Sequence, residues 1–117
     1  MSSDSVQLCL SRKTGEMLHR LRANRPLVHC ITNEVVQEFT ANVLLAAGAS
    51  PAMVVGEGEA EYFAGIASAL SVNVGTPYEA RIETMKKAIR GALAAGKLWV
   101  LDPVAAGGIP WRDKVIF

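Results

Sequence analysis

Short apolar runs that alternate with helix-length segments are the feature that most constrains how this 117-residue chain folds. In the clearest case, residues 27–31 form an apolar run with one histidine, which is typical of a parallel strand covered by helices on both faces. A Thr32-Asn33 corner and a helical stripe follow, and Gly48 ends that stripe before the next apolar run. Strands joined by helices in this way predict an α/β fold with a parallel sheet built by right-handed crossovers.

The alternation continues through the chain and predicts four strands. The TPYE segment at residues 76–79 combines an N-cap hydroxyl, a proline at the first helical position and a capping-box glutamate, so a helix is expected to begin there. The predicted helices are 6–21, 33–47, 59–68 and 76–95, and the predicted strands are 27–31, 52–55, 69–74 and 98–101. The apolar residues 115–117 predict the start of another buried element, so we expect the chain to continue past Phe117.

Composition excludes several classes of partner. The formal net charge is +1 and no basic stripe is present, so we expect no nucleic-acid partner. No apolar run approaches the ~20 residues that span a bilayer, and no signal-peptide pattern opens the chain. Cys9 and Cys30 lack CxxC spacing, and Cys30 is expected to be buried. These features predict a soluble, cytoplasmic protein with no membrane partner.

Polar residues gather where the predicted strands end. Because ligands of parallel α/β sheets bind beyond the carboxyl ends of the strands, we expect these residues to share one rim. The residues expected along this rim are Asn33, Met53, Asn73, Gly75, Thr76 and Asp102. His19 and His29 have no partner at metal or triad spacing, so neither is expected to be catalytic.

Each rim residue has two interpretations. Asn33 is either the N-cap of a helix or an amide that binds a ligand hydroxyl or ring nitrogen. Met53, predicted to lie within the second strand, is either plain core or a thioether that contacts an aromatic heterocycle. Both alternatives remain open from these residues alone.

The second half of the rim carries the same ambiguity. Gly75 and Thr76 form either a tight turn or a place where a ligand meets the backbone and helix N–H groups bind an anion. Asp102, which precedes Pro103, is either a turn former or a direct or water-mediated ligand for Mg²⁺. The chain has no GxxxxGK[ST] motif, which excludes a P-loop nucleotide site from this sequence.

Four motifs occur in one order: ITN-x-VV-x-x-FTAN from residue 31, GASPAM at 48–53, SVNVGT at 71–76 and LDPVAAG at 101–107. In these motifs the chain resembles the hydroxyethylthiazole kinase family. The resemblance implies a three-layer, parallel-sheet, ribokinase-like fold in incomplete form. Residues 1–117 would then be the N-terminal portion of a single kinase domain. Ala105 departs from the pattern, since many relatives carry glycine directly after DPV.

The resemblance also implies an activity. It is ATP-dependent phosphorylation of the hydroxyl of 5-(2-hydroxyethyl)-4-methylthiazole in thiamine biosynthesis or salvage, with Mg²⁺, in a homotrimer whose sites lie between subunits. The residues that it implies as substrate contacts are Asn33, Val35, Met53, Gly75 and Thr76. It places Asp102 near the metal and the general base beyond Phe117, so we expect this chain alone to be catalytically incomplete.

Two alternatives of other classes remain. One is a binding or assembly half-domain, which would bind the thiazole or associate without turnover. The other is a fragment of a related small-alcohol kinase that acts on a hydroxymethylpyrimidine or a sugar. Met53 and the Ile31-Thr32-Asn33 corner argue against this second alternative.

Overall fold

The computed structural model describes residues 2–117, which form five α-helices, one 3₁₀ turn and four strands. In chain order these are α1 (Ser3–Asn24), β1 (Leu27–Ile31), η1 (Glu34–Val36), α2 (Gln37–Ala47), β2 (Ser50–Ala52), α3 (Ala60–Ile66), β3 (Ala69–Asn73), α4 (Glu79–Ala94), β4 (Leu98–Asp102) and α5 (Pro110–Ile116). The four predicted strands and the helices between them are therefore all present; β1 has the predicted bounds, and the other elements have shifted ends.

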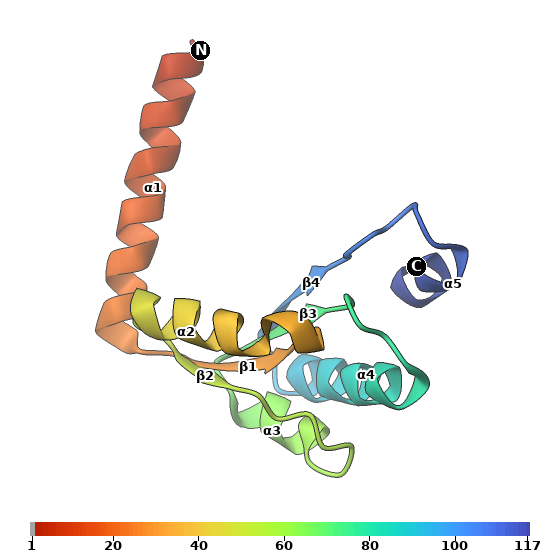
Figure 1. The fold of residues 1–117 in the computed structure, drawn as a ribbon. Coiled ribbons are helices and arrows are strands. Elements are labelled where there is room, and N and C mark those ends of the chain that lie inside the picture. The colour runs from red at the N-terminus through yellow and green to blue at the C-terminus, as the bar shows by residue number, and fades with distance from the viewer. Residues whose placement is uncertain (1) are drawn as a thin grey trace.

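The strands form one parallel sheet in the order β2-β1-β3-β4. Val28 lies opposite Ala69, and Ala69 lies opposite Leu98. Helix α2 covers one face of the sheet, and α3 and α4 cover the other (Figure 1). This three-layer arrangement confirms the predicted α/β architecture, and it brings the carboxyl ends of all four strands to one edge.

The core lies between the sheet and the pair α3 and α4. Ile31, Leu70 and Val72 point into it from the two central strands, and all three are 1% exposed or less. The helices meet them with small residues, since Ala60, Ala64, Ala88 and Ala92 are all fully buried. Small side chains let the two helices pack closely against each other and against the sheet.

The opposite face of the sheet is only partly covered. Helix α2 lies over β1, while on β4 Leu98 is 83% exposed and Val100 is 61% exposed. An apolar groove of about 370 Å³ runs between α2 and this face. The predicted burial of both faces therefore holds for β1, where residues 29–31 are buried, but does not extend to β4.

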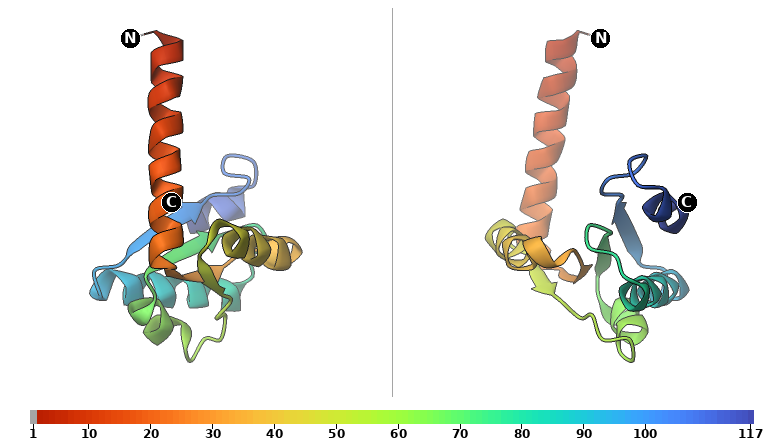
Figure 2. Two further views of the ribbon diagram at one scale, coloured as in Figure 1. Left: turned by 90° about the vertical axis from the view of Figure 1, so that its left-hand side faces the viewer. Right: turned by 45° about the vertical axis from the view of Figure 1, so that its right-hand side comes forward.

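Helix α1 projects away from the three layers (Figures 1 and 2). It begins at Ser3, earlier than predicted, because the Ser2 hydroxyl caps it by accepting a hydrogen bond from the Ser5 N–H at 3.2 Å. None of its side chains is buried. Within residues 2–117 the predicted amphipathic stripe is therefore mostly exposed, and its C-terminal end, where Leu21 is half-buried, lies near α2. Among these residues, no helix has the length and the apolar character that a membrane crossing requires.

Three predicted boundaries were wrong for identifiable reasons. Thr76 does not cap α4, which begins at Glu79 without a side-chain cap, because the Thr76 hydroxyl instead accepts a hydrogen bond from the Glu34 N–H at 3.0 Å. The second strand ends at Ala52, so Met53 follows β2 and does not lie within it. Asn33 starts a 3₁₀ turn, and the α-helix itself begins only at Gln37.

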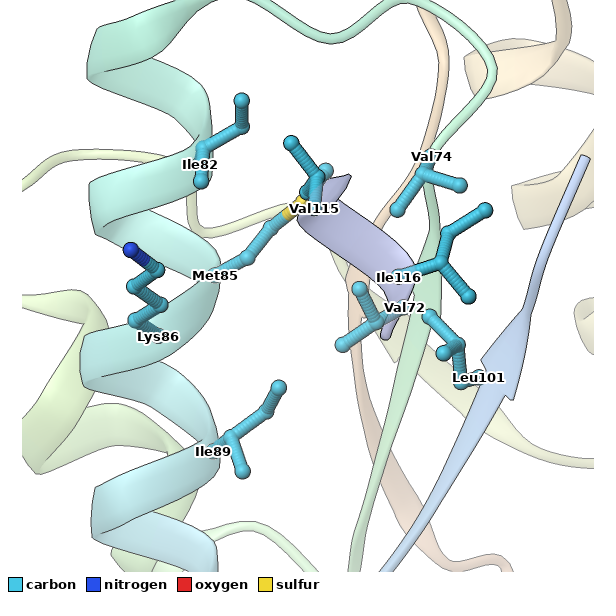
Figure 3. Close-up of a pocket in the computed structure, with 9 residues that line it drawn as sticks. All are labelled: Val72, Val74, Ile82, Met85, Lys86, Ile89, Leu101, Val115 and Ile116. Atoms are coloured by element: carbon cyan, nitrogen blue, oxygen red, sulfur yellow. The ribbon is translucent and has the colours of Figure 1, made fainter. Parts of the chain in front are cut away.

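Phe117 is 92% exposed, so the predicted buried element does not include it, but Val115 and Ile116 are half-buried against the core. They belong to α5, a short helix that the sequence analysis did not anticipate. Figure 3 shows Val115 and Ile116 directed toward Met85 of α4 and Val72 of β3. These four residues are among those that line a small, mostly apolar pocket of about 90 Å³.

Candidate functional site

The predicted rim residues lie along one edge of the sheet. Because all four strands are parallel, the strand order places Met53, Asn33, Asn73 and Asp102 in that sequence across the carboxyl edge. Asn73 and Asp102 are also direct partners in the β3–β4 register. The structure therefore brings together side chains from distant parts of the sequence. Asn33 and Asp102, for example, are 69 residues apart in the chain.

Among the described residues, the side chain of Asn33 makes two hydrogen bonds. Its Oδ1 accepts from the Val36 N–H at 3.1 Å, which makes it the N-cap of η1. Its Nδ2 donates to Asn73 Oδ1 at 3.0 Å. The capping interpretation is thus confirmed, although for a 3₁₀ turn. A role in binding substrate stays a prediction.

Asn73 is the centre of the polar network. Besides the bond from Asn33, its Oδ1 accepts from the Gly75 N–H at 2.9 Å. Its Nδ2 donates to Asp102 Oδ2 at 2.8 Å. One half-buried amide therefore connects the end of β1, the turn after β3 and the end of β4.

Gly75 is required by its protein neighbours. A Cβ atom at this position would lie 2.7 Å from Asn33 Cβ and 2.9 Å from Asn73 Oδ1, both closer than real contacts allow. From the sequence, Gly75 was either part of a tight turn or a place where a ligand meets the backbone, and a role in binding substrate stays a prediction. In the structure the space is taken by the two asparagines, so a side chain here would push the network apart.

Arg81 of α4 stabilises the Thr32-Asn33 corner after β1 by hydrogen bonding to its backbone. The sequence analysis did not identify this residue. Its side chain is 6% exposed, and its Nη1 donates to the Thr32 carbonyl oxygen at 2.7 Å. Its Nη2 lies 3.6 Å from Glu34 Oε1, and its guanidinium stacks on Tyr78 at 5.3 Å from the ring centroid. A buried arginine on a helix gave no sequence signal, because its partner is a backbone carbonyl 49 residues away.

Arg112 of α5 is a second residue that the sequence analysis missed. Its Nη2 donates to the Gly75 carbonyl oxygen at 3.2 Å, and its Nη1 donates to the Val104 carbonyl oxygen at 3.4 Å. These bonds tie the turn after β3 to the loop after β4. Nothing in the local sequence distinguishes this arginine from an exposed one.

Met53 and Val35 are not part of the hydrogen-bonded network. Met53 is half-buried and precedes Val54, whose carbonyl oxygen accepts a hydrogen bond from His29 Nε2 at 2.7 Å. The carbonyl oxygen can only accept, so Nε2 carries a proton, and burial lowers the pKa of His29, which favours the neutral ring. Val35 is 89% exposed on η1, beside Asn33 in sequence but without a partner among the described core residues.

Asp102 is the carboxylate of the rim. It is exposed at the end of β4, and Asn73 holds one of its oxygens. Within residues 2–117 no three acidic, histidine or cysteine side chains gather to hold a metal ion. A single carboxylate still fits Mg²⁺, which binds proteins through one or two carboxylates and keeps several waters.

The model of the hydroxyethylthiazole kinase family matches residues 18–117. A hydroxyethylthiazole kinase of Klebsiella pneumoniae is 61% identical over 98 residues, covering 84% of this chain and 38% of the relative. One of Cronobacter sakazakii is 56% identical over 114 residues, covering 97% of this chain and 42% of the relative. The chain thus spans about two fifths of the length of these curated relatives.

A solved structure shows the same similarity in three dimensions. The hydroxyethylthiazole kinase protein of Pyrococcus horikoshii OT3 superposes with a TM-score of 0.83 at 48% sequence identity. The match covers 86% of this chain and 40% of that one. All the rim residues from Asn33 to Asp102 lie inside the range that the family model matches.

Proposed function

We propose, since this chain belongs to the hydroxyethylthiazole kinase family, that the protein containing it phosphorylates the hydroxyl of 5-(2-hydroxyethyl)-4-methylthiazole with ATP, for thiamine biosynthesis or salvage. The sheet and its helices belong to the ribokinase-like fold. The observation that carries the proposal is the network from Asn33 through Asn73 to Asp102, because it joins a polar corner suited to an alcohol to a carboxylate suited to a cation.

The rim residues take different roles in this proposal. Asn33, Val35, Met53, Gly75 and Thr76 form the alcohol pocket, in which Met53 lies against the thiazole ring and Asn33 meets a polar atom. Positioning of the alcohol is the main contribution of these residues, since phosphoryl transfer depends largely on placing reactants and stabilising charge.

Asp102 is the residue that would hold Mg²⁺, directly or through water. When bound, the ion supplies positive charge that offsets the phosphate oxygens of ATP. Asn73 and Arg112 keep the two loops beside Asp102 in place. We assign the general base, which removes the alcohol proton, to a part of the protein outside residues 1–117.

The proposal includes an assembly and a location. Residues 1–117 are the N-terminal portion of a single kinase domain, and the complete enzyme is a cytoplasmic homotrimer with sites between subunits. The exposed apolar side chains of β4 and α2 support association. The two free cysteines, Cys9 exposed and Cys30 buried, are compatible with a reducing compartment.

A substrate panel tests the function. The full-length protein is incubated with ATP, Mg²⁺ and either the thiazole alcohol, a hydroxymethylpyrimidine or a sugar, and ADP release is followed. We expect release with the thiazole alcohol only, and turnover of another alcohol alone would reject the proposal. In the same assay Asn33→Ala should lower kcat/KM about tenfold or more. Asn24→Ala, an exposed asparagine of α1, serves as the matched control.

The 117-residue chain is assayed beside the full-length protein. We expect it to release no ADP, because no residue in it is assigned as the base. Turnover that depends on the thiazole alcohol would contradict this expectation.

A further inference from the structure

The orientation of Asn73 is fixed by partners that have only one hydrogen-bonding role. The Gly75 N–H can only donate, so the atom facing it at 2.9 Å is the carbonyl oxygen of Asn73. The Asp102 carboxylate is exposed and accepts, so the atom facing it at 2.8 Å is the amide nitrogen. Turning the amide over would break both bonds, and the network therefore has a single polarity.

The same argument fixes Asn33. The Val36 N–H can only donate, so it faces Asn33 Oδ1 at 3.1 Å, and Nδ2 is left to donate to Asn73 at 3.0 Å. An asparagine amide carries two N–H groups, and one of them is used here. Among the described residues no partner accepts from the second N–H, so Asn33 keeps one donor for a ligand at the rim.

The carboxylate of Asp102 likewise has one oxygen bound by the protein and one oxygen without a donor among the described residues. Asn73 binds its Oδ2, and among the described residues nothing donates to its Oδ1. One oxygen is thus held by the protein and the other is available to a cation or its water. The network is tightly packed at Gly75, because Asn33 and Asn73 fill the space that a side chain at this position would occupy.

We propose that Asn73 is a positioning residue: it holds Asn33 as a hydrogen-bond donor for an acceptor atom of the substrate and holds Asp102 with one oxygen open to the cation. This inference rests on the proposed function. It adds that the substrate presents an acceptor, the alcohol oxygen or the ring nitrogen, to Asn33. It also means that the position of Asn33, which faces the alcohol, and the position of Asp102, which faces the cation, both depend on the Asn73 side chain.

Two substitutions in the full-length protein separate the two tasks of Asn73. Asn73→Leu keeps the approximate shape and removes every bond. We expect the KM for the thiazole alcohol to rise about five- to tenfold and the Mg²⁺ concentration for half-maximal rate to change about fivefold or more, because both tasks are lost. Asn73→Asp keeps an acceptor toward Asn33 and Gly75 but loses the donor toward Asp102. Its thiazole KM should stay within about twofold, while the Mg²⁺ concentration for half-maximal rate changes about fivefold or more.

Binding measured without turnover supplies a second readout. Calorimetry with the thiazole alcohol alone, without ATP or metal, should show about five- to tenfold weaker binding for Asn73→Leu and near-normal binding for Asn73→Asp. In an Asn33→Ala background, Asn73→Leu should weaken binding no further, because it acts through Asn33. Asn24→Leu is the control, and thermal unfolding verifies that each variant is folded.

The outcomes distinguish the inference from the function on which it rests. If folded Asn73→Leu and Asn73→Asp lose thiazole binding equally, or if Asn73→Leu adds its full loss to Asn33→Ala, Asn73 is only structural and the positioning role is rejected. If the wild-type protein neither binds nor phosphorylates the thiazole alcohol, the proposed function itself fails.

Discussion

At the scale of single residues, His29 links the fold to pH. It is fully buried in β1, its Nε2 donates to the Val54 carbonyl oxygen at 2.7 Å, and its ring meets Phe63 edge-on at 5.0 Å. Burial lowers its pKa below the ordinary value of 6.5, and the bond to Val54 and the charge of Glu59 oppose this only in part. The folded protein therefore favours the neutral ring.

The sign of the pH effect follows from this shift. Well above pH 6.5 the ring is neutral in the folded and unfolded chains alike, and folding has no cost from it. As the pH falls below 6.5 the unfolded chain binds the proton first, so stability is lost down to the lowered folded pKa. We expect the melting temperature of His29→Gln to depend less on pH in this window than that of the wild type. His19→Gln, on exposed α1, should keep the wild-type dependence, and equal slopes for all three proteins would contradict the prediction.

Ala105 has an unfavourable backbone conformation. It lies in the loop after β4 with φ of 62°, in the left-handed region where a Cβ atom costs about 1–2 kcal/mol. Ala105→Gly should therefore stabilise the protein by about 1 kcal/mol, which denaturant unfolding would measure. Ala106→Gly is the matched control and should destabilise by about 0.5–1 kcal/mol, because its φ is not positive. A loss of stability in Ala105→Gly would show that the strain is absent.

At the scale of elements, the contact between α3 and α4 depends on Gly91. A Cβ atom at Gly91 would fall on the carbonyl oxygen of Glu61, so the two helices cannot keep their distance if it is present. Gly91→Ala should destabilise by about 1–3 kcal/mol or more through this overlap. Gly15→Ala in α1 has open space around its Cβ and should stabilise by about 0.5–1 kcal/mol. Thermal unfolding measures the stability of both variants. If Gly91→Ala leaves the stability unchanged, α3 and α4 can move apart at little cost, and the prediction is wrong.

The elements also show what the sequence could predict. Strands and helices were placed correctly where the signal is local, as in the apolar run of β1 and the Gly48 stop of α2. Thr76 was misassigned because its hydroxyl binds the Glu34 N–H, a partner 42 residues away that no local pattern reveals. The rim was predictable because parallel strands share a carboxyl edge. Arg81 and Arg112 were not, because both donate to backbone carbonyls brought near them only by folding.

At the scale of the whole molecule, the described chain leaves much apolar surface uncovered. On β4, an edge strand, Leu98 and Val100 are exposed, and on α1 Leu8 is 69% and Leu10 is 59% exposed. Open strand edges and contiguous apolar faces promote association. We expect the isolated 117-residue chain to self-associate in sizing with light scattering. Leu98→Glu should reduce this association, and a monodisperse wild-type monomer would refute it.

The register of the sheet has a consequence for biosynthesis. Val28 pairs with Ala69, and every neighbouring pair of strands is parallel, so none of the pairs can form as a local hairpin. After β1 leaves the ribosome, one of its edges can pair with β2 as soon as residues 50–52 are synthesised, but the other edge has no partner until the strand that ends at Asn73 has also been synthesised. Parallel pairing of this kind folds slowly and exposes apolar strands in the meantime. We therefore expect the nascent chain to benefit from a chaperone that shields exposed strands during translation, and slowing translation between β1 and β3 should lengthen that dependence.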